Sequence, residues 1–162
     1  MKDNQRTVLQ WPSGQNAWVT GVDVDDTYAR LMVGYVITMW GNVSSSTVSA
    51  QSGELLKFVH PYYHDTFREK LQKRAKQIKK YKTVSLSMRS VLGDGNEIKK
   101  SYLKDHTFSK IDTPVYKAEY LTRSNTLYGG KPKSQPYQRN LAIFFTVDNG
   151  KSWLLDIEEY EK

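Results

Sequence analysis

The sequence contains no cysteine, which excludes several kinds of chemistry. A chain without thiols forms no disulfides, has no cysteine nucleophile and offers no thiolate ligands to a metal ion. The sequence also lacks a run of the roughly 18 apolar residues that a membrane-spanning helix needs. Its first residues are polar and carry no apolar core of a secretory signal. We therefore expect either a cytosolic protein or a domain whose membrane segment lies outside this sequence.

Catalytic motifs are missing as well. There is no Gly-x-Ser-x-Gly nucleophile elbow, and residues 129–131 (GGK) lack the upstream glycine and the following hydroxyl of a phosphate loop. His60 and His64 have the four-residue spacing of a metal-binding pair, but Pro61 between them indicates a helix start that would separate the imidazoles. A third ligand would have to be His106, from a weakly patterned region. We predict no enzyme activity, no cofactor and no metal site.

The longest apolar stretch, from Asp26 to Val43, predicts a central helix. One face has apolar residues at three- and four-residue steps: Tyr28, Leu31, Met32, Tyr35, Val36, Met39 and Val43. Asp23, Asp25 and Asp26 precede or begin this helix, and helix capping explains them better than a cation site does. Val33 and Ile37 make the opposite face apolar too, which is typical of a helix packed on more than one side. We expect Val33 and Ile37 to contact a partner, and self-association to result.

The remaining pattern predicts helices followed by an antiparallel sheet. Two more helices are expected, at Thr47–Val59 and from Pro61 onward, and then four strands at Val84–Arg89, Val115–Tyr128, Tyr137–Val147 and Trp153–Tyr160. Asn149-Gly150 is the signal of a tight hairpin. The inward positions expected in the last strand are Trp153, Leu155 and Ile157. This is an α+β fold: helices on one face of about four strands, in a single domain (25–162) behind an extended N-terminal arm (1–24).

The net charge of +7 belongs to one segment. Eight cations and one anion lie between Arg68 and Lys82, and the rest of the chain is neutral. Most of these cations point away from the apolar stripe of the third helix, but Arg74 falls inside that stripe, where it would either extend past its neighbours or pair with a carboxylate. The candidate partner-binding residues of this helix are Arg68, Lys73, Arg74, Lys76 and Lys80. An acidic partner subunit, an anionic membrane surface and nucleic acid all remain possible ligands.

The order of short motifs along the chain is similar to that of a known family. An arm ending in Trp18-Val19 leads to Asp25-Asp26-Thr27-Tyr28, and a helix ending in residues 55–61 (LLKFVHP) precedes the run 75–79 (AKQIK). Tyr128-Gly129-Gly130 and a closing hairpin with acidic residues follow. From about Arg6 to Glu159, the chain resembles the TraE family of conjugative type IV secretion systems, the F-type relatives of the VirB-eight inner-membrane subunit.

The resemblance implies a non-enzymatic assembly subunit of the channel and pilus machinery. Members are anchored in the bacterial inner membrane, and their periplasmic domain has a nuclear-transport-factor-like, cone-shaped fold with a strongly curved sheet. This chain would then be the periplasmic domain, and its partners would be other secretion subunits. The full-length protein would be a homo-oligomer, and nucleic-acid binding would be at most weak and non-specific. The alternatives are a basic nucleic-acid-binding protein and a small-molecule-binding protein or enzyme with the same cone-shaped fold.

Overall fold

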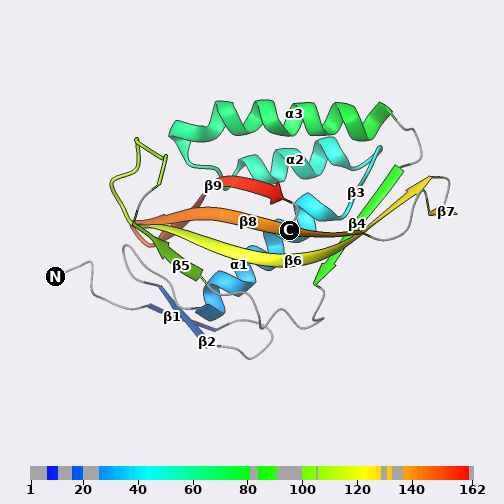
Figure 1. Cartoon of the computed structure of the whole chain (residues 1–162). Helices are drawn as coiled ribbons and strands as arrows, with labels where there is room; N and C mark the ends of the chain where they lie inside the picture. The colour runs from blue at the N-terminus through cyan, green and yellow to red at the C-terminus, as the bar shows by residue number, and fades with distance from the viewer. Residues whose placement is uncertain are drawn as a thin grey trace.

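Three α-helices pack on one antiparallel sheet (Figure 1). The computed structural model describes residues 7–10, 16–19, 26–80, 84–90, 100–104, 106–128, 131–132 and 137–160. Within these ranges, the helices precede the long strands, and this order confirms the predicted α+β class. None of the helices described is both long and apolar enough to cross a membrane.

The elements follow the predicted order closely. The helices are α1 (Asp26–Gly41), α2 (Val48–Leu56), a 3-10 turn η2 (Pro61–Tyr63) and α3 (His64–Lys80). The strands are β1 (Thr7–Gln10), β2 (Asn16–Val19), β3 (Val43–Ser44), β4 (Val84–Ser90), β5 (Lys100–Leu103), β6 (Val115–Tyr128), β7 (Lys131–Pro132), β8 (Tyr137–Asp148) and β9 (Lys151–Tyr160).

The main sheet has the order β3-β4-β6-β8-β9, and β5 and β7 also pair with β6. The turn between β8 and β9 places Asn149 at φ 50° and Gly150 at φ 74°. Positive φ at both central residues is the conformation that Asn-Gly favours in a tight hairpin, so this prediction is confirmed. At the N-terminus, β1 and β2 form a separate antiparallel pair, and β2 lies against α1. Residues 11–15, which join the two strands, lie outside the described residues.

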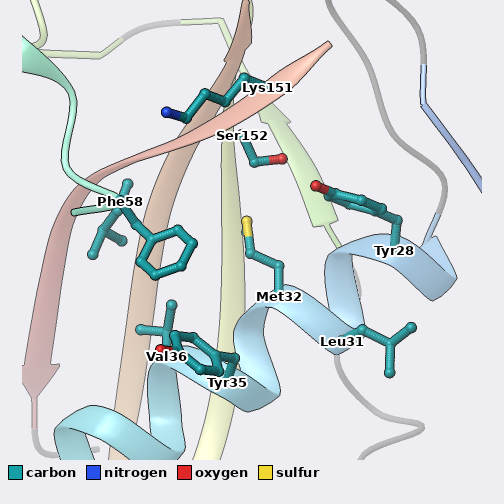
Figure 2. A pocket seen from close by; sticks show the side chains of 9 residues that line it. Tyr28, Leu31, Met32, Tyr35, Val36, Phe58, Lys151 and Ser152 are labelled. Atoms are coloured by element: carbon teal, nitrogen blue, oxygen red, sulfur yellow. The ribbon is translucent and has the colours of Figure 1, made fainter. Parts of the chain in front are cut away.

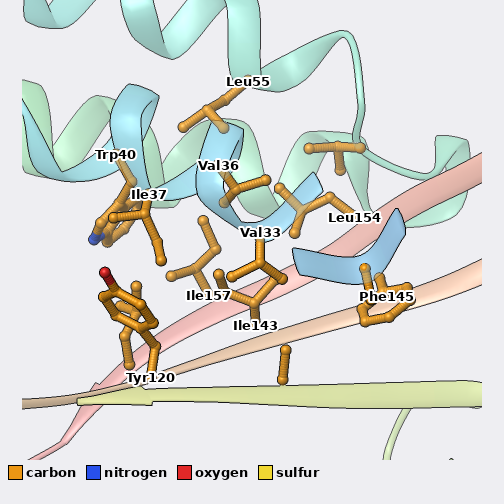
Figure 3. Packing of buried hydrophobic residues seen from close by; sticks show 14 of the residues in the cluster. Val33, Val36, Ile37, Trp40, Leu55, Tyr120, Ile143, Phe145, Leu154 and Ile157 are labelled. Carbon is orange, nitrogen blue, oxygen red and sulfur yellow. The ribbon is translucent and has the colours of Figure 1, made fainter. Parts of the chain in front are cut away.

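Helix α1 lies between the sheet and α2, which confirms its central place (Figure 3). Its buried side chains are Ala29, Val33, Val36, Ile37 and Trp40. They meet a face of the sheet built from Tyr116, Ala118, Tyr120, Leu141, Ile143, Phe145 and Ile157. The exposed fraction is 0% for Val33 and 5% for Ile37. The prediction that these two residues contact a partner is therefore wrong. A helix with apolar residues all round gives no indication of which face meets the sheet. The large hydrophobic side chain that α1 does expose belongs to Tyr35, with an exposed fraction of 39%.

The last strand also departs from its predicted alternation. In the pairing of β8 with β9, Phe145 lies opposite Leu154 and Phe144 lies opposite Asp156, so Leu155 is an extra residue in a β-bulge. Leu154 and Ile157 therefore join the core between helices and sheet, whereas Leu155 packs with Ile111 and Val115 in a second cluster. Trp153, predicted to face inward, is only half-buried.

Candidate functional site: the basic face of helix α3

Helix α3 is amphipathic because its apolar residues recur at helical spacing. Phe67, Leu71 and Ile78 are buried, and Ala75 packs beside Ile78. Asp65 lies in the first turn and Lys79 and Lys80 in the last, so the charges complement the helix dipole. The apolar stripe holds the helix on the domain and directs most of its cations outward.

Three of the predicted site residues form an exposed row on this helix. Lys73, Lys76 and Lys80 are all exposed, and their spacing of three and four residues places them on one face. We call these three residues the lysine ridge. An ammonium group on a solvated helix keeps its hydration and its mobility, and several of them in a row attract an anionic surface from a distance. The ridge is therefore accessible to a ligand on the outer face of the basic helix.

Arg68 takes part in local contacts at the start of α3. Its guanidinium lies 3.3 Å from the Asp65 carboxylate and 3.1 Å from Nδ1 of His64. The Asp65 side chain is 90% exposed, so this ion pair is screened by solvent. Arg68 therefore lies on the surface, but part of its charge is balanced by its own helix.

Lys70 is directed toward the sheet instead of toward solvent. Its Nζ lies 2.9 Å from Oδ1 of Asp156 in β9 and also donates to the carbonyl oxygen of Ile157. The same Asp156 oxygen accepts from the backbone N–H of Ile157, at 2.8 Å. Lys70 thus fastens α3 to the edge strand and caps a backbone carbonyl there. The acidic C-terminal strand thus pairs with the basic helix at Asp156.

Arg74 lies over an aromatic ring, which explains an arginine within the apolar stripe. Its guanidinium carbon is 4.0 Å from the centroid of the Trp40 ring. This distance is well within the range of a cation–π interaction. The Trp40 indole N–H in turn donates to Oε1 of Glu159, at 2.7 Å. The structure thus gives Arg74 a packing role between α1 and α3.

Between α3 and β9 runs a groove of about 530 Å³ that charged residues border on both sides. Its lining includes Lys70, Lys73 and Arg74 on the helix side, and Glu158 and Glu159 on the strand side. Opposite charges therefore face one another across the groove. Lys73 is the member of the lysine ridge that borders it.

Tyr160, which lines this groove, contacts a carboxylate of the neighbouring sheet, Glu119. Glu119 lies 2.7 Å from Nζ of Lys117 and accepts from the Tyr160 hydroxyl at 3.1 Å. The hydrogen bond from Lys117 holds the pKa of Glu119 below its usual value and raises the pKa of Lys117. Burial, followed by the hydrogen bond to Glu119, raises the pKa of Tyr160. These groups stabilise the sheet in their charged or hydrogen-bonded forms.

The histidines have separate structural surroundings. His60 Nδ1 accepts from the backbone N–H of Tyr62 at 3.2 Å and caps η2, while burial lowers the pKa of the His60 imidazole. His64 contacts Arg68, and His106 Nδ1 accepts from the Phe108 N–H at 3.2 Å. Within the described part of the chain, no three His, Asp or Glu side chains come together as metal ligands would.

Much of this site could not be found by sequence reasoning. The sequence marked Arg74 as unusual but did not identify its partner, and it gave no indication that Lys70 pairs with β9 or that Arg68 pairs within the first helical turn. Lys79 is exposed too, although it was not among the candidate partner-binding residues. Its position in the last turn of α3 is the feature of the sequence that could have identified it. Lys82 and Tyr81 lie outside the residues that the structure describes.

The family profile described as TraE protein matches residues 1–88 of the chain. This match covers the segment from the N-terminal hairpin through all three helices and most of β4. No curated protein and no solved structure matches the chain. The matched residues make up more than half of the sequence and contain the complete basic helix. The chain therefore belongs to the TraE family, whose members are conjugative transfer proteins.

Proposed function

We propose that this chain is a non-enzymatic scaffold subunit of the inner-membrane complex of a type IV secretion system, acting in mating-pore and pilus assembly. The lysine ridge would bind an acidic surface on another subunit of that complex. The observation that carries this proposal is the concentration of the net charge on the basic segment of a TraE-family chain, with Lys73, Lys76 and Lys80 exposed on the surface of α3. We assign the domain to the periplasm and expect the full-length protein to be a homo-oligomer.

A non-enzymatic role is supported by how the sheet meets the helices. The side chains of β6 and β8 that face α1 are fully packed; Ala118, Leu141, Ile143 and Phe145 each have an exposed fraction of 0%. Enzymes with a nuclear-transport-factor-like fold would need ionisable groups inside the curved sheet. Here hydrocarbon fills the space in which such groups would stand. Because the helices pack on one face of the sheet in this way, we also propose that the chain has the cone-shaped, nuclear-transport-factor-like fold.

Reversing the charge of the ridge tests the scaffold proposal. The triple substitution Lys73→Glu, Lys76→Glu and Lys80→Glu should abolish conjugative transfer while leaving the free energy of unfolding within about 1 kcal/mol of the starting protein, because exposed charges contribute little to stability. A matched control reverses three exposed lysines outside α3: Lys57, Lys104 and Lys110. Both variants change the net charge equally. Normal transfer by the ridge variant, or an equal defect in the control, would contradict the proposal.

The second candidate is nucleic-acid binding, which the same positive charge favours. A ridge of three lysines offers few phosphate contacts, so DNA affinity should be sequence-independent and should fall steeply as salt rises. We expect no binding to duplex DNA at physiological ionic strength. Tight binding under those conditions would instead favour the nucleic-acid alternative.

A further inference from the structure

A second cavity lies away from the basic helix, between α1 and the start of β9 (Figure 2). Its volume is about 300 Å³. Most of its wall is hydrocarbon or aromatic ring, from Tyr28, Leu31, Met32, Tyr35, Val36, Phe58 and Leu154. Lys151 and Ser152 complete the lining. Ligand cavities start at about this size, so the space suits a single ring or a short chain.

The cavity has one polar group that lacks a partner. The exposed fraction of Ser152 is 8%, and its hydroxyl has no hydrogen-bond partner among the residues that the structure describes. Figure 2 shows this hydroxyl on the cavity side of β9, directed toward the side of Tyr28. Burying a hydroxyl without a hydrogen bond is unfavourable, and native proteins rarely tolerate it unless water or a ligand supplies the bond.

The rim of the cavity is formed by residues that can adjust. Tyr35 and Phe58 are partly exposed and contact each other edge to face, with ring centroids 5.2 Å apart. Met32 supplies a flexible thioether to the wall. Lys151 also lines the cavity, and its ammonium lies 3.9 Å from the centroid of the Trp153 ring. These walls accept an apolar ring, and no carboxylate is among the lining residues described.

We propose that this cavity is a binding site for a small aromatic molecule that carries one hydroxyl group. The ring would lie among Met32, Val36 and Leu154, and its hydroxyl would form the missing hydrogen bond with Ser152. Such a ligand contacts α1, the segment after α2 and β9 at once, so it joins three parts of the domain. The site is independent of the lysine ridge and of the proposed scaffold role.

A matched pair of probes, p-cresol and toluene, tests the site by nuclear magnetic resonance titration of the isotope-labelled chain. Both should shift the amide signals of Val36 and Leu154. Binding of p-cresol should be tighter by about 2- to 12-fold, the contribution of one hydrogen bond. Ser152→Ala should remove that difference and leave toluene binding unchanged. The melting temperature of Ser152→Ala without ligand should be equal or higher, because the lost hydroxyl has no partner in the described structure.

Filling the cavity provides the second test. Met32→Trp and, separately, Leu31→Trp should each abolish the response to both probes. Leu31 is only half-buried, so its variant keeps the test valid if Met32→Trp fails to fold. The proposal is overturned if neither probe shifts the cavity signals, if Ser152→Ala binds p-cresol as tightly as the starting protein, or if the folded tryptophan variants still bind both probes.

Discussion

Replacing Lys70 by methionine tests whether this cation of α3 stabilises the fold, in contrast to the exposed cations that we propose bind a partner subunit. The substitution removes an ammonium that pairs with Asp156 at 2.9 Å and donates to the Ile157 carbonyl, while the methionine chain retains most of the hydrocarbon contacts. An ion pair of this exposure is worth about 0.2–1 kcal/mol. A hydrogen bond from a charged donor adds up to about 1.5–3 kcal/mol when buried, and solvent reduces it here because the Lys70 side chain is 39% exposed. We expect a total loss of about 1–2 kcal/mol.

Thermal and urea unfolding measure this loss. For a chain of this length, the melting temperature should fall by about 2–8 °C. The matched control is Lys73→Met on the same helix, which should change the free energy of unfolding by less than about 0.5 kcal/mol because Lys73 is exposed. Equal destabilisation by the two variants, or none by Lys70→Met, would refute the division of the basic helix into structural and accessible cations.

Three further predictions concern the core, the hairpin and His60. Phe145→Ala should cost about 3–5 kcal/mol in chemical unfolding, since Phe145 is fully buried, whereas Tyr62→Ala, at a 68% exposed position, should cost less than about 0.5 kcal/mol. Gly150→Ala should destabilise the β8–β9 hairpin by about 1–2 kcal/mol because Gly150 has a φ of 74°. Gly53→Ala, in open space on α2, should instead stabilise the fold by about 0.5–1 kcal/mol. A change of the same sign at both glycines would contradict this reasoning. Because burial lowers the pKa of His60 in the folded state, the unfolded chain binds more protons, so stability should fall as pH drops below the ordinary value of 6.5. His60→Asn keeps a capping side chain and should flatten the pH dependence between about pH 5 and 7; an unchanged slope would assign that dependence to other groups.

The strands could be predicted from sequence because their patterns are local. The alternation of apolar and polar residues in β6 and β8 gave nearly the correct bounds of both strands, and Asn149-Gly150 identified the hairpin by the φ angles that these residues tolerate. Similarly, Pro61 marked the start of the third helical segment. In each case the sequence neighbours themselves determine the conformation.

Features set by tertiary contacts could not be predicted in this way. Val33 and Ile37 were assigned to a binding face because α1 is apolar on all sides, and only its packing on the sheet decides which face is buried. The bulge at Leu155 shifts the inward positions of β9 by one residue, and no residue type signals it. The partners of Lys70 and Arg74 are distant in sequence, so charge patterning along the helix could identify neither Asp156 nor Trp40.

Photo-crosslinking from the lysine ridge in transferring cells is the most direct test of the scaffold role. A photoreactive amino acid would replace Lys76, and in a matched control it would replace Lys104, which is exposed outside α3. The proposed role predicts that the Lys76 position crosslinks to an acidic segment of another transfer subunit, identified by mass spectrometry, and that the Lys104 position does not. Crosslinks from Lys76 only to lipid or DNA, or the same protein crosslinks from both positions, would contradict a subunit-binding ridge on α3.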